Sequence, residues 1–258
     1  MPVTVFSSAG CIRCGIVTRH LEDKGIAFVG HDIKTPAGNA AFKAFYREHR
    51  SHIRRDAGGI FFPVVMDGDG RITQDAGCTL ARFMTGGDLS GMVEPNNLGH
   101  GWIGGLFSSR GGEEDIEPFL AVLRLLKKGG LATEVSSNGR RGTLLRTILT
   151  EGLVNRLLFH VPCPVPESLP DRNDLELSLN VAQAAKSMIE LRFFLDVGKP
   201  GRPVSPSAAA ESAQLMQEAT ADNRLPLVIS NSAGGDVNLF PYRTAARRWQ
   251  VLAEIAPR

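Results

Sequence analysis

Two cysteines separated by two residues, Cys11 and Cys14, are the side chains of this sequence best suited to chemistry. Thiols at this spacing can close into a disulfide and reopen, and so exchange two electrons with another disulfide. Arg13 lies between them and brings a positive charge that favours the thiolate form of a neighbouring thiol. The spacing and the charge together predict a dithiol that reacts near neutral pH.

The residues around the two cysteines predict a strand that turns into a helix. Residues 3–6 form a short β-branched and aromatic run, residues 7–10 are turn-forming, and helical spacing of apolar residues begins at Ile12. Cys11 is therefore expected at the N-terminus of a helix, where the helix dipole lowers the pKa of a thiol. Cys14 is expected one turn deeper, as the resolving thiol. The alternative is a pair of inert core thiols.

The next stretches complete a recognisable order of elements. We expect strands over 26–31, 62–66 and near 71–73, and helices over 12–24, 36–50 and 77–84. Together with the dithiol and Pro63, this order resembles a glutaredoxin-type redoxin over about residues 1–85. The resemblance implies a thioredoxin-like domain and thiol–disulfide oxidoreductase activity. It also implies that Pro63 is cis and lies opposite Cys11 and Cys14 in the active site.

Two departures from that family concern the electron donor. Ile12-Arg13 stands where the family usually has Pro-Tyr or a similar pair, and residues 4–10 lack the lysine often found before the first cysteine. The donor is therefore either glutathione or a reductase, and the substrate is a protein disulfide or glutathione. No resident cofactor is required for this chemistry.

Residues 86–100 are rich in Gly, Asn and Pro and are expected to form a linker. After it, strand and helix signals alternate regularly. Five strand candidates, each followed by a helical pattern, predict a parallel sheet arranged as a partial TIM-barrel-like (βα) domain over 101–258. The expected strands are 102–107, 132–135, 154–160, 191–195 and 227–230, and the expected helices are 114–128, 140–151, 173–187, 206–221 and 241–254.

The loops of this second half carry another resemblance. Gly111-Gly112-Glu113 follows the first strand and Asn138-Gly139 follows the second, which is similar to radical S-adenosylmethionine enzymes of the glycyl-radical-activating type. The resemblance implies S-adenosylmethionine contacts at Gly111, Gly112, Glu113 and Asn138. The family's CxxxCxxC cluster motif is missing, so we expect a degenerate domain that does not cleave S-adenosylmethionine. The simpler interpretation is a helix-capping turn and a common turn dipeptide.

Composition and charge exclude several classes of protein. A net charge of +2 gives no reason to expect nucleic-acid or membrane binding, and no apolar run is long enough to span a bilayer. Four cysteines are too few for a secreted disulfide framework, so a cytoplasmic location is expected. No second cysteine pair completes a metal site, so no metal is predicted. A basic stretch is either a solvated helix end or a docking patch for an acidic partner or for glutathione carboxylates: Arg47, His49, Arg50, His52, Arg54 and Arg55.

The combined prediction is a two-domain thiol–disulfide oxidoreductase whose C-terminal domain binds a partner or ligand. One alternative is a non-enzymatic adaptor for a glycyl-radical enzyme or a ribonucleotide reductase. Another is an iron–sulfur carrier in which Cys11 of two subunits holds a bridging cluster. Cys78 is expected to pack as a small buried residue, and Cys163 is either a third redox thiol or an inert loop thiol.

Overall fold

The computed structural model is an α/β protein with one mixed sheet and one largely parallel sheet. It describes residues 2–56, 59–84, 89, 92–94, 103–107, 113–199, 202–221, 226–231, 237–249 and 252–255. The chain divides into two compact units, the first made of Met1–Leu106 with Arg110–Glu134 and the second of Phe107–Ser109 with Val135–Arg258. None of the described helices is long and apolar enough to cross a membrane.

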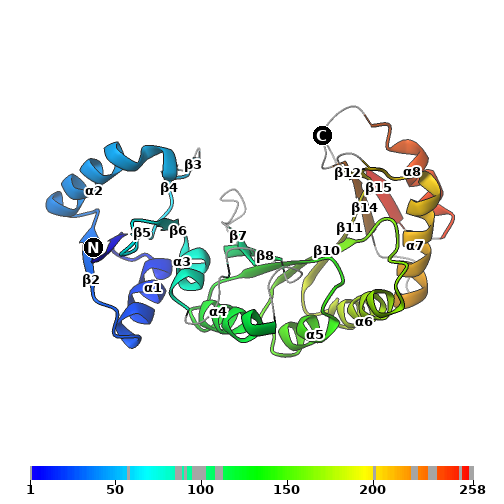
Figure 1. Cartoon of the computed structure of the whole chain (residues 1–258), viewed down its shortest axis with the longest axis horizontal. Helices are drawn as coiled ribbons and strands as arrows, with labels where there is room; N and C mark the ends of the chain where they lie inside the picture. The colour runs from blue at the N-terminus through cyan, green and yellow to red at the C-terminus, as the bar shows by residue number, and fades with distance from the viewer. Residues whose placement is uncertain are drawn as a thin grey trace. The chain divides into compact units, whose positions relative to one another are not determined.

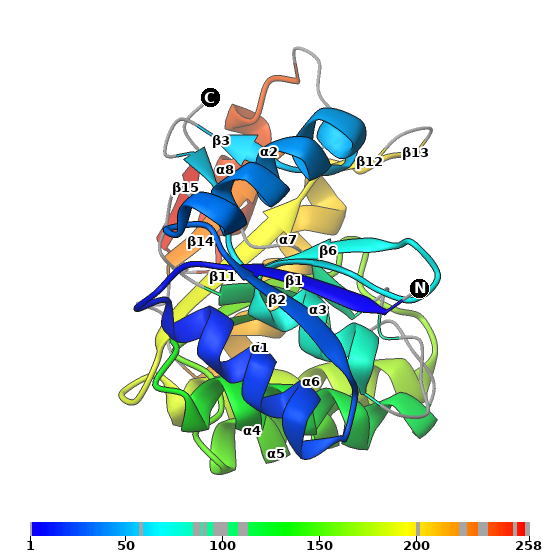
Figure 2. The same cartoon turned by 90° about the vertical axis from the view of Figure 1, so that its left-hand side faces the viewer.

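The first unit is built on a four-stranded sheet in the order β2-β1-β5-β6. β1 pairs parallel with β2 and antiparallel with β5, and β6 closes the sheet antiparallel to β5. Helix α2 covers one face of the sheet, and α1 and α3 cover the other (Figures 1 and 2). The bounds are β1 Val3–Ser7, α1 Ile12–Asp23, β2 Phe28–Asp32, α2 Pro36–His49, β5 Val64–Met66, β6 Ile72–Gln74 and α3 Ala76–Phe83.

Shorter elements complete the first unit. They are the 3₁₀ helix η1 Arg50–His52, the hairpin of β3 Arg55–Asp56 with β4 Gly59–Ile60, the antiparallel pair of β7 Val93–Glu94 with β8 Ile103–Phe107, the 3₁₀ helix η4 Glu113–Asp115 and α4 Ile116–Lys128. The strand expected over 102–107 is confirmed as β8, but β3, β4 and β7 were not expected, because runs of two residues carry no readable period.

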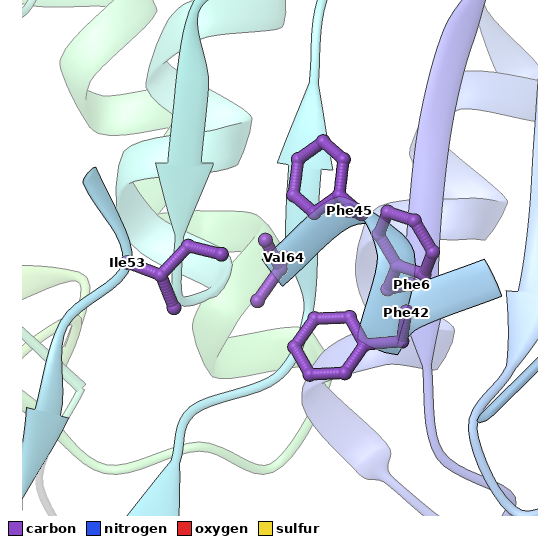
Figure 3. Close-up of a cluster of buried hydrophobic side chains, with 5 residues drawn as sticks. All are labelled: Phe6, Phe42, Phe45, Ile53 and Val64. Carbon is purple, nitrogen blue, oxygen red and sulfur yellow. The ribbon is translucent and has the colours of Figure 1, made fainter. Parts of the chain in front are cut away.

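An aromatic cluster fills the space between α2 and the sheet (Figure 3). The ring of Phe6 on β1 lies 4.7 Å from that of Phe45 and 5.2 Å from that of Phe42, both on α2. Val64 on β5 and Ile53 after η1 close the cluster, and all five side chains are buried. Burying a large apolar side chain stabilises a fold by about 1.5–3 kcal/mol, so this cluster is a main reason why α2 holds its place.

The helices of the first unit begin at side-chain caps. Thr35 Oγ1 accepts the N–H of Gly38 at 3.0 Å, and Pro36 stands in the first turn of α2. Asp75 accepts the N–H of Cys78 at 2.9 Å and so begins α3. Such caps satisfy N–H groups that have no partner inside the helix.

The second unit contains a sheet in the order β15-β14-β11-β10-β9. β10, β11, β14 and β15 run parallel, and helices α5, α6, α7 and α8 follow one another along one face (Figure 1). The bounds are β9 Thr133–Ser137, α5 Gly142–Thr150, β10 Arg156–Val161, α6 Leu169–Ala185, β11 Glu190–Asp196, β12 Gly198–Lys199, β13 Arg202–Pro203, α7 Pro206–Thr220, β14 Pro226–Ser230, α8 Phe240–Arg247 and β15 Leu252–Ile255.

The two faces of this sheet differ in burial. Along β10, Leu157, Phe159 and Val161 are buried, and the residues that alternate with them are only half-buried. β11 and β14 show the same alternation. One face therefore forms the core of the unit, and His160 and Phe194 belong to the other.

Three sequence-based expectations need correction here. The helix expected over 241–254 ends at Arg247, and residues 252–255 form β15, parallel to β14. The cause is tertiary structure. The edge of β14 offers backbone hydrogen-bond partners to residues 252–255, and this pairing outweighs their weak preference for a helix. The helix expected from 173 begins at Leu169, because Ser168 caps it by accepting the N–H of Asp171. Cys78 is half-buried rather than buried. Most of the expected linker at 86–100 lies outside the described residues.

Candidate functional site

The two cysteines of the CxxC sequence form a disulfide at the start of α1, with their Cα atoms 5.3 Å apart. Cys11 is the N-cap of the helix, and its Sγ accepts the backbone N–H of Cys14 at 3.2 Å. A donor aimed at sulfur stabilises negative charge on it, so the same contact favours a Cys11 thiolate in the reduced protein. The strand, turn and helix expected around the pair are confirmed.

The two sulfurs differ in exposure. Cys11 is half-buried, and the side chain of Cys14 is only 3% exposed. An incoming disulfide can therefore reach Cys11 from solvent, and Cys14 is reached only from Cys11. The expected asymmetry of position, with Cys14 deeper, is confirmed.

The loop before Cys11 is held in place from the neighbouring strand. Asp32 at the end of β2 accepts the N–H of Ala9 at 3.2 Å, and Lys34 Nζ donates to the carbonyl oxygen of Ala9 at 2.8 Å. Gly10 has a φ of +81°, a conformation that glycine adopts without strain. The loop thus keeps a fixed path although residues 4–10 carry no charge of their own.

The segment before β5 faces the dithiol. The peptide bond between Phe62 and Pro63 is cis, Pro63 is buried, and the carbonyl oxygen of Phe62 lies 3.9 Å from Cys11 Sγ. The guanidinium of Arg13 lies over the ring of Phe61, 5.0 Å from its centroid. The structure therefore brings together all three residues predicted for the catalytic site, Cys11, Cys14 and Pro63.

Sequence inspection missed Asp32, Lys34 and Phe61 as parts of this site. They lie 20 to 50 residues from the cysteines, and only the sheet brings them close. For Asp32 and Lys34 the strand–helix–strand order was a usable signal, because it predicts parallel pairing of the two strands. In the structure this pairing sets Ser7 opposite Asp32. The loop after β2 then necessarily meets the loop after β1.

Of the predicted cofactor residues of the second half, the structure describes Glu113 and Asn138. Gly111 and Gly112 lie outside the described residues, and Glu113 begins η4. Asn138 uses its amide oxygen to accept the N–H of Arg140 at 3.2 Å, inside its own turn. Gly139 has a φ of +80° and lies against Leu175, where a Cβ would collide. The geometry at Asn138 is that of a closed turn packed on α6.

The N-terminus of α5 already has an anionic partner. The carboxylate of Asp174 on α6 accepts the N–H groups of Arg141 and Gly142, the latter at 2.6 Å. These are the groups that would otherwise be offered to a ligand anion. Ser178 Oγ donates to the carbonyl oxygen of Gly139 at 2.9 Å, which fixes the same turn from the other side.

The fourth cysteine, Cys163, lies in the loop after β10 and is 1% exposed. The peptide bond between it and Pro164 is cis, and Ser212 Oγ donates to the carbonyl oxygen of Pro162 at 2.8 Å. On the strand before it, His160 stacks on Phe194 with ring centroids 5.4 Å apart. Burial lowers the pKa of His160 from its usual value, and the nearby Asp196 carboxylate opposes that shift.

Within the described residues, no three His, Cys, Asp or Glu side chains are grouped so as to hold a metal ion. Comparison of the chain with protein-family models, with curated proteins and with solved structures finds no match. The two family resemblances therefore stay predictions, and the feature of the described residues that points to a function is the geometry of the dithiol.

Proposed function

We propose that this protein is a thiol–disulfide oxidoreductase that uses Cys11 as nucleophile and Cys14 as resolving thiol. The observation that carries the proposal is the asymmetric pair at the start of α1. One sulfur is half-buried and accepts an N–H from the helix, and the other is 3% exposed. The N–H contact caps α1 in either case, but an accessible sulfur whose thiolate is favoured by a donor is needed only for thiol chemistry.

The proposed reaction exchanges one disulfide for another. The Cys11 thiolate attacks a sulfur of the substrate disulfide, forms a mixed disulfide and releases one substrate thiolate. Cys14 loses its proton to solvent and attacks Cys11, which releases the second substrate thiol and leaves the Cys11–Cys14 disulfide. The substrate is reduced by two electrons, and an external thiol such as glutathione, or a reductase, returns them.

The segment at Phe62 and Pro63 supports a role in substrate positioning. The Phe62 carbonyl beside Cys11 is a backbone acceptor next to the reacting sulfur, so an extended substrate chain has a partner there. The arrangement of four strands with α2 on one face and α1 and α3 on the other supports the glutaredoxin-like, thioredoxin-fold assignment.

The decisive experiment is trapping of the mixed disulfide. Cys14→Ser should accumulate a covalent adduct at Cys11 when mixed with a disulfide substrate such as oxidised glutathione or insulin. Mass spectrometry of the tryptic peptide identifies the sulfur used. An adduct on Cys78 or Cys163 with none on Cys11, or the absence of any adduct, would refute the proposal. Cys78→Ser is the matched control, because it removes a thiol outside the pair.

For the second unit we infer partner or ligand binding on the half-buried face of its sheet. His160, Phe194 and Asp196 lie on this face of β10 and β11. The partial-barrel interpretation is supported by four parallel strands with helices following along one face. No step of the proposed reaction passes through S-adenosylmethionine.

A further inference from the structure

A pocket of about 840 Å³ lies along the outer edge of β6, within the first unit. It is bounded by β6, by α3, and by the segments around η1 and Val93. Among the described strands, β6 is the last of its sheet, and none of them pairs with this edge. The volume is within the range of about 300–1,000 Å³ that small-molecule sites occupy.

Of the described residues, five basic ones, three arginines and two histidines, line this pocket, and no carboxylate does. They come from the end of α2, from η1 and the segment after it, from the turn before β6, and from α3: His49, His52, Arg54, Arg71 and Arg82. The carboxylates of Asp67 and Asp69 pair with Arg82 at 2.6 and 2.9 Å, and the carboxylate of Glu48 lies 3.9 Å from His49 Nε2. Among the residues that the structure describes, the exposed side chain of Arg71 forms no ion pair.

The rest of the lining is apolar or neutral. Ile72, Leu89 and Val93 give the pocket an apolar wall, and Thr73 and Gln74 add neutral polar groups. Gln74 is itself fixed, because its amide accepts the N–H of Arg54 at 2.6 Å and donates to the carbonyl oxygen of Phe61 at 3.1 Å. The lining therefore suits a compound with anionic groups on an apolar body.

The pocket is separate from the dithiol. Its lining contains neither cysteine of the pair, nor Phe62 or Pro63. Cys78, which takes no part in a disulfide, does line it, so that thiol can report on occupancy.

We propose that this pocket binds a small organic anion carrying at least two phosphate or carboxylate groups. Guanidinium groups bind both kinds of anion through paired N–H donors, and charge-assisted hydrogen bonds of this kind are about twice as strong as neutral ones. Anionic groups lie against Arg71 and His52, and the body of the ligand lies against Leu89 and Val93. The proposal does not depend on the reaction assigned to Cys11 and Cys14.

The test is calorimetric titration of the full chain with pyrophosphate and, separately, with citrate. Saturable binding of one molecule is expected for at least one of them, and the stronger response identifies phosphate or carboxylate as the preferred group. Arg71→Glu should weaken that binding by about tenfold or more, because a charged hydrogen bond is replaced by repulsion. Arg19→Glu, the same charge change at an exposed position of α1 outside the pocket, should leave it within about twofold.

A second measurement uses Cys78. Its alkylation rate, followed by mass spectrometry, should fall when the binding anion is added to the natural protein and stay constant in Arg71→Glu. If Arg71→Glu does not fold, His52→Glu at another exposed lining position takes its place. The double variant Cys11→Ser with Cys14→Ser should bind the anion unchanged. No saturable binding of either anion, equal weakening by Arg19→Glu, or loss of binding in the double-serine variant would each overturn the proposal.

Discussion

Each unit has a cysteine in a loop that follows a strand, and in each case the cysteine lies beside a cis peptide bond. The two sites nevertheless differ in the exposure of the cysteine and in whether it forms a disulfide. Cys11 lies beside the Phe62–Pro63 bond, is half-buried, caps a helix and has Cys14 as a partner. Cys163 precedes Pro164 in a cis bond, is 1% exposed and takes no part in a disulfide.

The difference shows that residue type and local backbone do not by themselves make a reactive site. In the first unit, Asp32 and Lys34 brace the loop from the side and leave Cys11 Sγ accessible. In the second unit, Ser212 on α7 bonds the loop carbonyl of Pro162, and the thiol is covered. Thiol–disulfide exchange requires a second sulfur to reach the thiol. The two loops therefore differ more in the exposure of their cysteine than in their sequence.

The largest expected effect that tests this comparison is on activity. Cys11→Ser should abolish reduction of a disulfide substrate, because the attacking sulfur is gone. Cys163→Ala should leave the turnover rate within about twofold, since a buried thiol away from the pair takes no part in the exchange. Both are measured by insulin reduction with a thiol donor. If the two substitutions cost the same activity, Cys163 belongs to the redox site.

The next effect is on thiol reactivity in the reduced protein. Limited alkylation at pH 7 should mark Cys11 first. Cys163 should react at least about a hundredfold more slowly, because it needs a local opening that costs about 3 kcal/mol. Peptide mapping after short exposure to iodoacetamide gives the order. Faster labelling of Cys14 than of Cys11 would reverse the assignment of nucleophile and resolving thiol.

A pair of glycine substitutions compares the loop before Cys11 with the turn between β9 and α5 in the second unit. Both Gly10 and Gly139 have φ near +80°, but a Cβ at Gly10 meets open space and one at Gly139 meets Leu175. Gly10→Ala should lower the free energy of unfolding by about 1 kcal/mol, and Gly139→Ala by about 3 kcal/mol, because strain and overpacking add. Denaturant unfolding of both variants checks this. Equal costs would mean that the turn at Gly139 is not packed.

The smallest expected effect is a pH dependence of stability in both units. Burial lowers the folded-state pKa of His20, helped by Lys24 and opposed by the carbonyl of Phe83, and burial also lowers that of His160. Below a pH of about 6.5 the unfolded chain binds protons that the folded chain does not, so the free energy of unfolding falls as pH falls. Each histidine contributes at most about 1.4 kcal/mol per pH unit.

Variants of the two histidines test the origin of this slope. Denaturant unfolding between pH 7.5 and pH 5 should give a shallower decline for His20→Gln and for His160→Gln than for the natural protein. A decline that both variants leave unchanged would assign the effect to other groups.

Much of the first unit was predictable because its local signals agree with its tertiary structure. The β-branched run of residues 3–6, the turn at Gly10 and the apolar spacing after Ile12 all point to one strand, turn and helix. The position of β15 was not predictable, because residues 252–255 extend only when the edge of β14 is available. The start of α6 was readable from the cap at Ser168 and from Pro170 in the first turn, the same signals that mark α2 at Thr35 and Pro36.

The sequence alone determined that two thiols stand at the start of a helix, with Pro63 at the head of a later strand. Those features depend on neighbouring residues, and short-range hydrogen bonds specify them. Only the tertiary structure decided that Lys34 bonds the loop before Cys11 and that Phe61 lies against Arg13. It alone also decided that Cys163 is covered and that basic residues from separate elements converge on the edge of β6. Each of these depends on contacts between residues far apart in the chain, and burial and convergence arise only once the elements pack.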